Sequence, residues 1–225
     1  MLEFNCLHLD GTAEAVTLDR FTLFCAGYTG RDRESIERHI AELEEQLGVP
    51  RPASVPACFP MAARLALVAE PSIEVYGRST SGEAEPVLLC SGGRARWLAV
   101  GSDHTDRDHE RHGIAQSKNL CPKVLSRDVW DLEEVIGRWD TLVLRAWSDG
   151  EPYQDAPLAT MLTAADLLAA VPAGRMTAEA IVMGGTIPTL GGLKFGQRFE
   201  CSLADPETNR ELRVGYDVVG LDPIS

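Results

Sequence analysis

Short apolar runs separated by turn residues dominate the first 27 positions and most of the chain after residue 60. The runs LEFNCLHL and AVTLDRFTLFCAGY flank the pair Asp10-Gly11, a combination typical of a β-hairpin. Runs that predict further strands follow, separated by Gly and Pro: ARLALVAEPSIEVYG, EPVLLCSGGRARWLAVGSD, TLVLRAW, IVMGGTIP, RFECSL and ELRVGYDVVG. The pattern indicates a β-rich body.

Helical periodicity is confined to a few stretches. The segment RDRESIERHIAELEEQLG predicts a helix that ends at Gly48 and Pro50, with an apolar face made of Ile36, Ile40, Leu43 and Leu47. A second helix is predicted over 158–170, with Leu158, Met161, Leu162, Ala165 and Leu168 on one face, and a short helix in VWDLEEVIGRW. The four prolines of residues 49–60 predict a connector that is neither helix nor central strand.

Composition limits the classes of partner. The net charge of −13 argues against nucleic acid or an anionic membrane surface, since both require clustered Lys and Arg. No apolar run approaches the roughly 20 residues of a membrane span, and the start of the sequence does not resemble a signal peptide. The six cysteines are scattered without a CxxC pair, as expected of core residues in a reducing compartment. We therefore expect a cytoplasmic protein.

The densest group of ionisable residues is SDHTDRDHERH, residues 102–112. It follows the apolar run WLAV, which predicts a buried strand with Asp103 at its end. Upstream, Glu83 and Glu85 are spaced by two, so an extended segment directs both carboxylates to one face. Three converging carboxylates suit a hard divalent cation such as Mg²⁺ or Mn²⁺, whereas the alternative interpretation is a set of solvated strand faces.

The same stretch allows other interpretations. Its histidines, with or without Asp108, suggest a zinc or iron site, but their spacings of five and three match no established ligand pattern: His104, His109 and His112. Arg107 and Lys118 would bind a carboxylate or enolate, or pair with nearby acidic residues. Cys121 is either a nucleophile or a packing residue.

One further pair lies on the first predicted helix. His39 and Glu42, three positions apart, are neighbours on its surface and would form a general-base pair or a solvated helix flank.

Six segments, taken together and in order, resemble the motifs of the fumarylacetoacetate hydrolase superfamily. They are GEAEPVLL, SDHTDRDHE, NLCPK, DGEPYQDAPLATM, VMGGTIP and LKFGQRFECSL. The resemblance extends from about Glu83 to the C-terminus, and the N-terminal third matches more loosely. What identifies the superfamily is the order and spacing of the whole set rather than any single motif.

The resemblance implies a role for each matching residue. It places Mg²⁺, Mn²⁺ or Ca²⁺ on Glu83, Glu85 and Asp103, and it makes Lys118 the lysine that polarises a substrate carbonyl, with Lys123 as the substitute. It assigns Arg107, Gln154 and Thr186 to the substrate side of the site. The pair His39 and Glu42 is similar to the superfamily's lid dyad, which activates a water molecule.

The resemblance also implies the fold and the activity. The expected fold is α+β and β-rich, a mixed β-roll or β-sandwich with a few peripheral helices. Residues 1–60 would provide the hairpin, helix and Pro-rich connector, as a possible lid, and residues 61–225 the catalytic roll, in one integrated domain.

The expected activity is metal-dependent hydrolysis of a C–C bond in a small 2-oxo acid or β-dicarbonyl compound by a homodimer. Decarboxylation, keto–enol isomerisation and non-catalytic binding of a small carboxylic acid remain alternatives.

Overall fold

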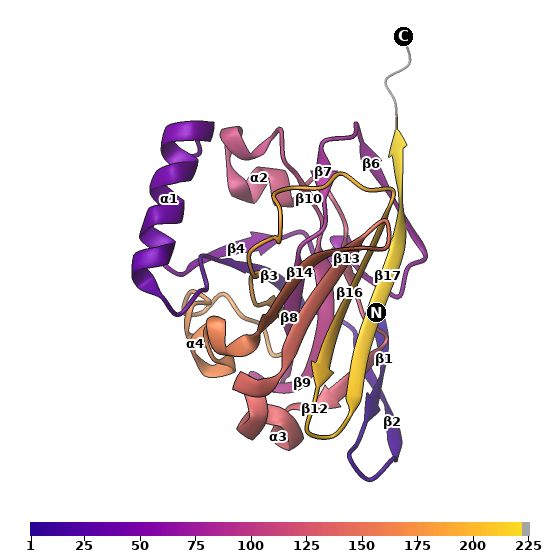
Figure 1. Cartoon of the computed structure of the whole chain (residues 1–225). Helices are drawn as coiled ribbons and strands as arrows, with labels where there is room; N and C mark the ends of the chain where they lie inside the picture. Colours follow the sequence, from indigo (N-terminus) through magenta and orange to yellow (C-terminus); the bar gives the residue numbers. More distant parts are fainter. Residues whose placement is uncertain (222–225) are drawn as a thin grey trace.

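The computed structural model describes residues 1–221, which form two large mixed β-sheets with short helices around them (Figure 1). The ten-stranded sheet contains β1 (Leu2–Leu7), β2 (Ala13–Leu18), β3 (Thr22–Gly27), β4 (Ala57–Met61), β5 (Ala66–Val68), β8 (Ala84–Ser91), β9 (Arg94–Asp103), β11 (Lys123–Leu125), β12 (Asp128–Asp131) and β15 (Ala180–Met183). The five-stranded sheet contains β6 (Ser72–Tyr76), β13 (Val143–Ser148), β14 (Glu151–Pro157), β16 (Arg198–Asp205) and β17 (Arg210–Leu221).

The remaining elements are short, apart from the first helix. Strands β7 (Thr80–Ser81) and β10 (Thr105–Asp106) form a two-stranded ribbon. The α-helices are α1 (Arg33–Leu47), α2 (Ile114–Lys118), α3 (Leu132–Val135) and α4 (Ala164–Ala169). Four 3₁₀ turns span Ala63–Leu65, Glu110–His112, Ile136–Thr141 and Leu158–Thr160. The expected β-rich fold with peripheral helices is confirmed.

Strand β8 is buried on both faces and separates two hydrophobic cores. On one face, Leu88 packs in the core shared with Leu144 and Leu203 of the five-stranded sheet. On the other face, Leu89 belongs to a second core that contains Phe4 of β1. Because β1 and β8 are separated by β12 and β9 in the sheet order, the ten-stranded sheet must curl around this second core to bring them together. Burial on both faces explains why EPVLLCS is a continuous apolar run rather than an alternating one.

Local signals place the hairpin and the first helix as predicted. The β1–β2 turn is closed by Asp10, whose Oδ1 accepts from the backbone N–H of Thr12 at 2.9 Å. Helix α1 begins after Asp32, which caps it, and ends at Gly48 in the left-handed conformation. The apolar face of α1 is buried at Ile36 and Ile40, whereas the side chain of Leu47 lies outside the described residues.

Two predicted helices differ from the structure. Residues 158–170 form a 3₁₀ turn and the separate helix α4, because Met161 is extended and pairs with Gly30, after which Thr163 caps α4 by accepting from the N–H of Asp166. In VWDLEEVIGRW the first three residues belong to strand β12, and only the remainder is helical. In both cases pairing with a distant strand or residue overrides the local helical pattern.

The first 60 residues are part of the same sheet as the rest of the chain. Strand β3 pairs in parallel with β15, β1 pairs in parallel with β12, and β4 forms the edge of the sheet beside β3. As expected of a segment with four prolines, β4 is not a central strand. Among residues 1–221, no helix is both long and apolar enough to cross a membrane.

Candidate metal centre

Three carboxylates meet where β8 begins and β9 ends. Glu83 precedes β8 directly, and its carbonyl oxygen accepts from the backbone N–H of Asp103, the last residue of β9, at 2.9 Å. Glu85 lies two residues further along β8 and therefore on the same face as Glu83. Each of the three offers an oxygen atom, and these atoms lie within 4.8 Å of one another. The structure thus brings together the carboxylates that the sequence predicts as metal ligands.

Two lysines compensate the charge of Asp103. Lys118, at the end of α2, places its Nζ 2.9 Å from Glu83 Oε2 and in contact with Asp103 Oδ2. Lys123 lies opposite Asp103 in the β11–β9 ladder, with Nζ 2.8 Å from Asp103 Oδ1. Lys123 also donates to the carbonyl oxygens of His104 and Cys121, so its three N–H groups are used, whereas Lys118 donates to two carboxylates within the described residues, which leaves its third N–H without a partner there.

The electrostatics keep Asp103 and Lys118 charged despite their burial. Burial by itself raises the pKa of Asp103, but the ammonium groups of Lys118 and Lys123 outweigh it and hold the pKa well below its usual range. Burial by itself lowers the pKa of Lys118, and the carboxylates of Asp103 and Glu83 raise it well above its usual value.

Glu85 forms no ion pair with a Lys or Arg side chain in the described residues. Its Oε2 accepts from the backbone N–H of Gly185 at 3.0 Å, while Oε1 is buried without a hydrogen-bond partner in the described part of the chain. Burial, followed by the charge of Asp103, raises the pKa of Glu85 well above its usual value, although the charge of Lys118 opposes this shift. An all-oxygen donor set with one carboxylate outside any ion pair fits a hard divalent ion such as Mg²⁺ or Mn²⁺.

Replacing Glu85 with glutamine is expected to weaken divalent-ion binding at least tenfold while leaving the metal-free protein as stable or more stable. A carboxyl group whose pKa is higher in the folded than in the unfolded state makes its full contribution to stability below its unfolded pKa, near 4.5. This contribution is lost as the pH rises through the folded pKa. Glutamine does not ionise, so the stability of the variant does not fall with pH in this way. Urea unfolding of both metal-free proteins from pH 5 to pH 8 and calorimetric Mn²⁺ titration measure the two effects. A variant with unchanged ion affinity would contradict the assignment.

The residues predicted for the substrate side surround the carboxylates and are largely engaged with the protein. Arg107 donates from Nη1 to Glu83 Oε1 at 3.1 Å and to Glu110 Oε1 at 2.7 Å, whereas its Nη2 is buried without a partner among residues 1–221. Gln154 accepts from the N–H of Ala84 and donates to Thr186 Oγ1 at 2.7 Å. Gln154 and Thr186 therefore fix the turn after β15 against the start of β8.

His39 and Glu42 lie exposed on α1, and no hydrogen bond or ion pair joins them in residues 1–221. The His39 ring centroid is 6.5 Å from that of Tyr28. Burial, followed by the charge of Glu110, raises the pKa of the Tyr28 hydroxyl, and the charge of Lys118 opposes this shift. Tyr28 thus connects the side of α1 that carries His39 with the charged groups around the carboxylates.

The histidines of residues 102–112 are not brought together with the carboxylates as ligands. His104 is buried between the hydroxyls of Tyr216 and Thr80, each 2.9 Å from a ring nitrogen, and burial, followed by the charge of Lys123, lowers its pKa to about 3. The His109 ring pairs with Asp106, and the side chains of His109 and His112 are exposed. The thiol of Cys121 is buried, and burial raises its pKa to about 11, which disfavours a nucleophilic thiolate.

Thr29 is a candidate that the sequence analysis missed. Its hydroxyl is buried without a partner in the described residues and lies against Gly185, where an added Cβ would approach Oγ1 to 2.1 Å. Gly185 has a φ of +81° and donates to Glu85, so Thr29 lies beside the candidate metal centre. The residues around Thr29 in the sequence, Tyr28 and Gly30, carry no pattern that marks it as part of this centre.

A family model described as "Protein of unknown function (DUF2848)" matches residues 26–216. The chain belongs to this family. The matched region of this DUF2848 protein contains every residue predicted above for the metal centre, the substrate side and the lid dyad. No curated protein matches the sequence.

Solved structures with the same fold are divergent in sequence. A fumarylpyruvate hydrolase from Pseudomonas aeruginosa, in complex with Mn²⁺ and pyruvate, is 17% identical with a TM-score of 0.67, covering 98% of this chain and 96% of that one. A 5-carboxymethyl-2-hydroxymuconate delta-isomerase from Mycobacterium smegmatis is 13% identical with a TM-score of 0.65, covering 98% and 99%. A yeast fumarylacetoacetate hydrolase family protein is 17% identical with a TM-score of 0.65, covering 91% and 95%. The predicted resemblance to the superfamily is thus confirmed for the fold.

Proposed function

We propose that this chain is a divalent-metal-dependent enzyme that hydrolyses a C–C bond in a small 2-oxo acid or β-dicarbonyl compound of the acylpyruvate type. The observation that carries the proposal is the convergence of Glu83, Glu85 and Asp103 within 4.8 Å, beside the ammonium group of Lys118. The similar fold of a fumarylpyruvate hydrolase with bound Mn²⁺ and pyruvate supports it.

In the proposed reaction, Glu83, Glu85 and Asp103 would hold the ion, which would supply Lewis-acid polarisation of the substrate oxygens. The N–H of Lys118 that has no partner in the described residues would donate to the carbonyl oxygen that becomes negative as the C–C bond breaks. Nη2 of Arg107 and the hydroxyl of Thr29, which also lack a partner there, would donate to the carboxylate end of the substrate.

Hydrolysis requires a base, and we propose His39, oriented by Glu42, for this role. Both side chains are exposed and are not joined to each other, so the pair must assemble when substrate binds. This observation favours a second candidate function, decarboxylation or keto–enol isomerisation at the same ion, in which no water is activated.

Replacing His39 with alanine is expected to separate the two candidates. For a hydrolase, kcat falls about 10²–10³-fold, because general-base catalysis contributes about that much, while Mn²⁺ affinity is unchanged. For a decarboxylase, which activates no water, kcat stays within about threefold of the original, whereas a keto–enol isomerase, which must also move a proton, is distinguished from a hydrolase by its product. Replacing the nearby exposed Arg38 with alanine provides a control on the same helix. Full hydrolytic turnover in the His39 variant would show that His39 and Glu42 are not the general-base pair.

The function itself is tested with chelated protein reconstituted with Mg²⁺ or Mn²⁺. Fumarylpyruvate and other acylpyruvates test hydrolysis, and oxaloacetate tests decarboxylation and tautomerisation. We expect metal-dependent loss of the acylpyruvate ultraviolet absorbance with release of pyruvate. Saturable binding of these acids without turnover would indicate a small-acid binding protein instead. We also propose a homodimer, which light scattering of the purified protein would measure.

A further inference from the structure

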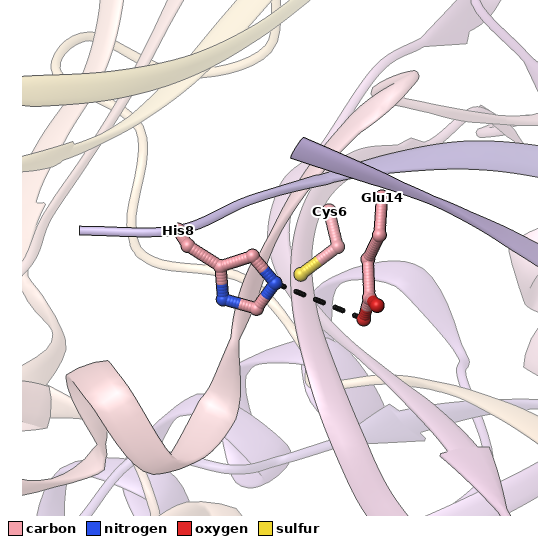
Figure 2. Close-up of side chains that lie close together, drawn as sticks. All are labelled: Cys6, His8 and Glu14. Atoms are coloured by element: carbon pink, nitrogen blue, oxygen red, sulfur yellow. Dashed lines mark ion pairs between the residues drawn. The ribbon is translucent and has the colours of Figure 1, made fainter. Parts of the chain in front are cut away.

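A second group of metal-ligand side chains lies on the β1–β2 hairpin (Figure 2). Cys6 is in β1, His8 lies two residues after Cys6 and directly follows the strand, and Glu14 of β2 is the ladder partner of Cys6. Alternation places Cys6 and His8 on one face, and direct pairing places Glu14 on the same face. A sulfur, a nitrogen and an oxygen from these three side chains lie within 4.8 Å of one another.

This group is remote from the carboxylate centre. Strand β1 runs parallel to β12, with Cys6 paired to Val129. Strand β12 runs antiparallel to β9, with Asp131 paired to Trp97, so Val129 is level with Ala99. Asp103 is four residues further along β9, which corresponds to about 13 Å of extended strand, and it lies two strands away from Cys6. The hairpin cluster is therefore separate from the carboxylate cluster.

A neighbouring carboxylate holds the His8 ring in an orientation suited to a ligand. His8 Nδ1 lies 3.2 Å from Glu134 Oε1, and the second oxygen of Glu134 accepts from the backbone N–H of Leu9 at 2.9 Å. With Nδ1–H bound in this way, the lone pair is on Nε2, which faces Glu14 Oε1 at 3.7 Å. Histidines that bind metals through one nitrogen characteristically donate the other N–H to a carboxylate or carbonyl.

The environment of Cys6 is also suited to a cation. The carboxylates of Asp131 and Glu14 place negative charge around its Sγ, which favours a cation at this position. Binding of a divalent ion would form a bond to Sγ as the S–H bond breaks, and the proton would be released to solvent. The cluster reaches the surface at Glu14, whose side chain is 61% exposed.

We propose that Cys6, His8 and Glu14 form a second metal site, selective for zinc-class ions, that fastens the hairpin to α3 through Glu134. Thiolate, imidazole and carboxylate together favour Zn²⁺ over Mg²⁺, and three protein ligands leave a fourth position for water. The site is chemically distinct from the all-carboxylate centre, because only this one contributes sulfur.

Cobalt titration in excess Mg²⁺ tests the proposal. Mg²⁺ saturates the carboxylate centre, and the near-ultraviolet thiolate-to-cobalt absorption reports only on sulfur ligation. We expect this band in the unmodified protein, displaced by Zn²⁺ at one equivalent. Replacing His8 or Glu14 with glutamine is expected to weaken Co²⁺ binding at least tenfold. Glu134→Gln removes the carboxylate that positions His8, and it is expected to weaken Co²⁺ binding by about 10-fold or more.

Two further variants make the outcome decisive. Cys90→Ser, which alters another buried cysteine of the same sheet, keeps the band, whereas Cys6→Ser loses it. If Cys6→Ser fails to fold, the surface variant Glu14→Gln still tests the site, since in excess Mg²⁺ one equivalent of Zn²⁺ should raise the Tm of the unmodified protein clearly more than that of this variant, and equal shifts would overturn the proposal. A folded protein without the thiolate band, or a band that persists in Cys6→Ser, would overturn the proposal.

Discussion

Replacing Asp103 with asparagine is expected to abolish divalent-ion-dependent turnover and to destabilise the fold. The substitution removes a ligand carboxylate whose charge is fixed by two ammonium groups. It also leaves Lys123, which has no exposed surface, without its buried counter-charge. Breaking a buried ion pair by removing one partner costs about 3–5 kcal/mol, so the free energy of unfolding should fall by about that amount. Calorimetric Mn²⁺ titration and urea unfolding measure the two losses.

A second buried aspartate provides the matched control for this variant. Asp205 is also buried, and it accepts from Arg138 at 2.9 Å and from Thr208 at 2.8 Å in the β16–β17 turn. Asp205→Asn should lower stability without changing ion affinity, because Asp205 is not part of the carboxylate cluster. If Asp103→Asn bound Mn²⁺ as tightly as the unmodified protein, the metal centre would be wrongly assigned.

Replacing Lys118 with methionine is expected to lower kcat about 10²–10³-fold while tightening divalent-ion binding. The loss follows from removing the donor to the developing oxyanion, for which effects of this size are typical. The gain follows because the ammonium group lies against Glu83 and Asp103 and repels a cation held by the same carboxylates. In the absence of metal the variant should also be less stable, since the buried carboxylate of Asp103 and the partly buried carboxylate of Glu83 lose a partner.

Steady-state kinetics and Mn²⁺ calorimetry on the same preparation separate these effects. Lys194→Met is the control, because the Lys194 side chain is only partly buried and, within the described residues, donates to the carbonyl oxygen of Pro152 rather than to the carboxylate cluster. It should change neither kcat nor ion affinity. Weaker ion binding in Lys118→Met would show that the lysine supports the site structurally rather than acting in catalysis.

The carboxylate cluster could be predicted because it depends on local rules. Spacing by two places Glu83 and Glu85 on one face of a strand, and the run WLAV marks the strand that ends at Asp103. The antiparallel β8–β9 pairing, joined by a short turn, then places Asp103 beside Glu83. Periodicity and turn signals are reliable for such neighbouring strands.

Contacts between distant segments could not be predicted in this way. Thr29 and Gly185 meet only because β3 pairs in parallel with β15, and no local pattern encodes that pairing. The break in the predicted helix at Met161 has the same origin, since its partner is Gly30. His104 looked like part of a histidine cluster, but the hydroxyl of Tyr216, 112 residues away, accounts for one of its ring nitrogens.

The central strands and helix α2 should open at different free energies. This difference affects the order in which substrate, products and a metal ion would leave the site. Glu85 and Asp103 lie on strands in the middle of the ten-stranded sheet, whose amides should exchange with solvent only through near-global opening. Lys118 ends a five-residue helix that has no side-chain N-cap, and such a segment opens at a lower free energy. In the proposed enzyme, the lysine side of the site would therefore open and close many times, admitting substrate and releasing products, while an ion would stay on the carboxylates.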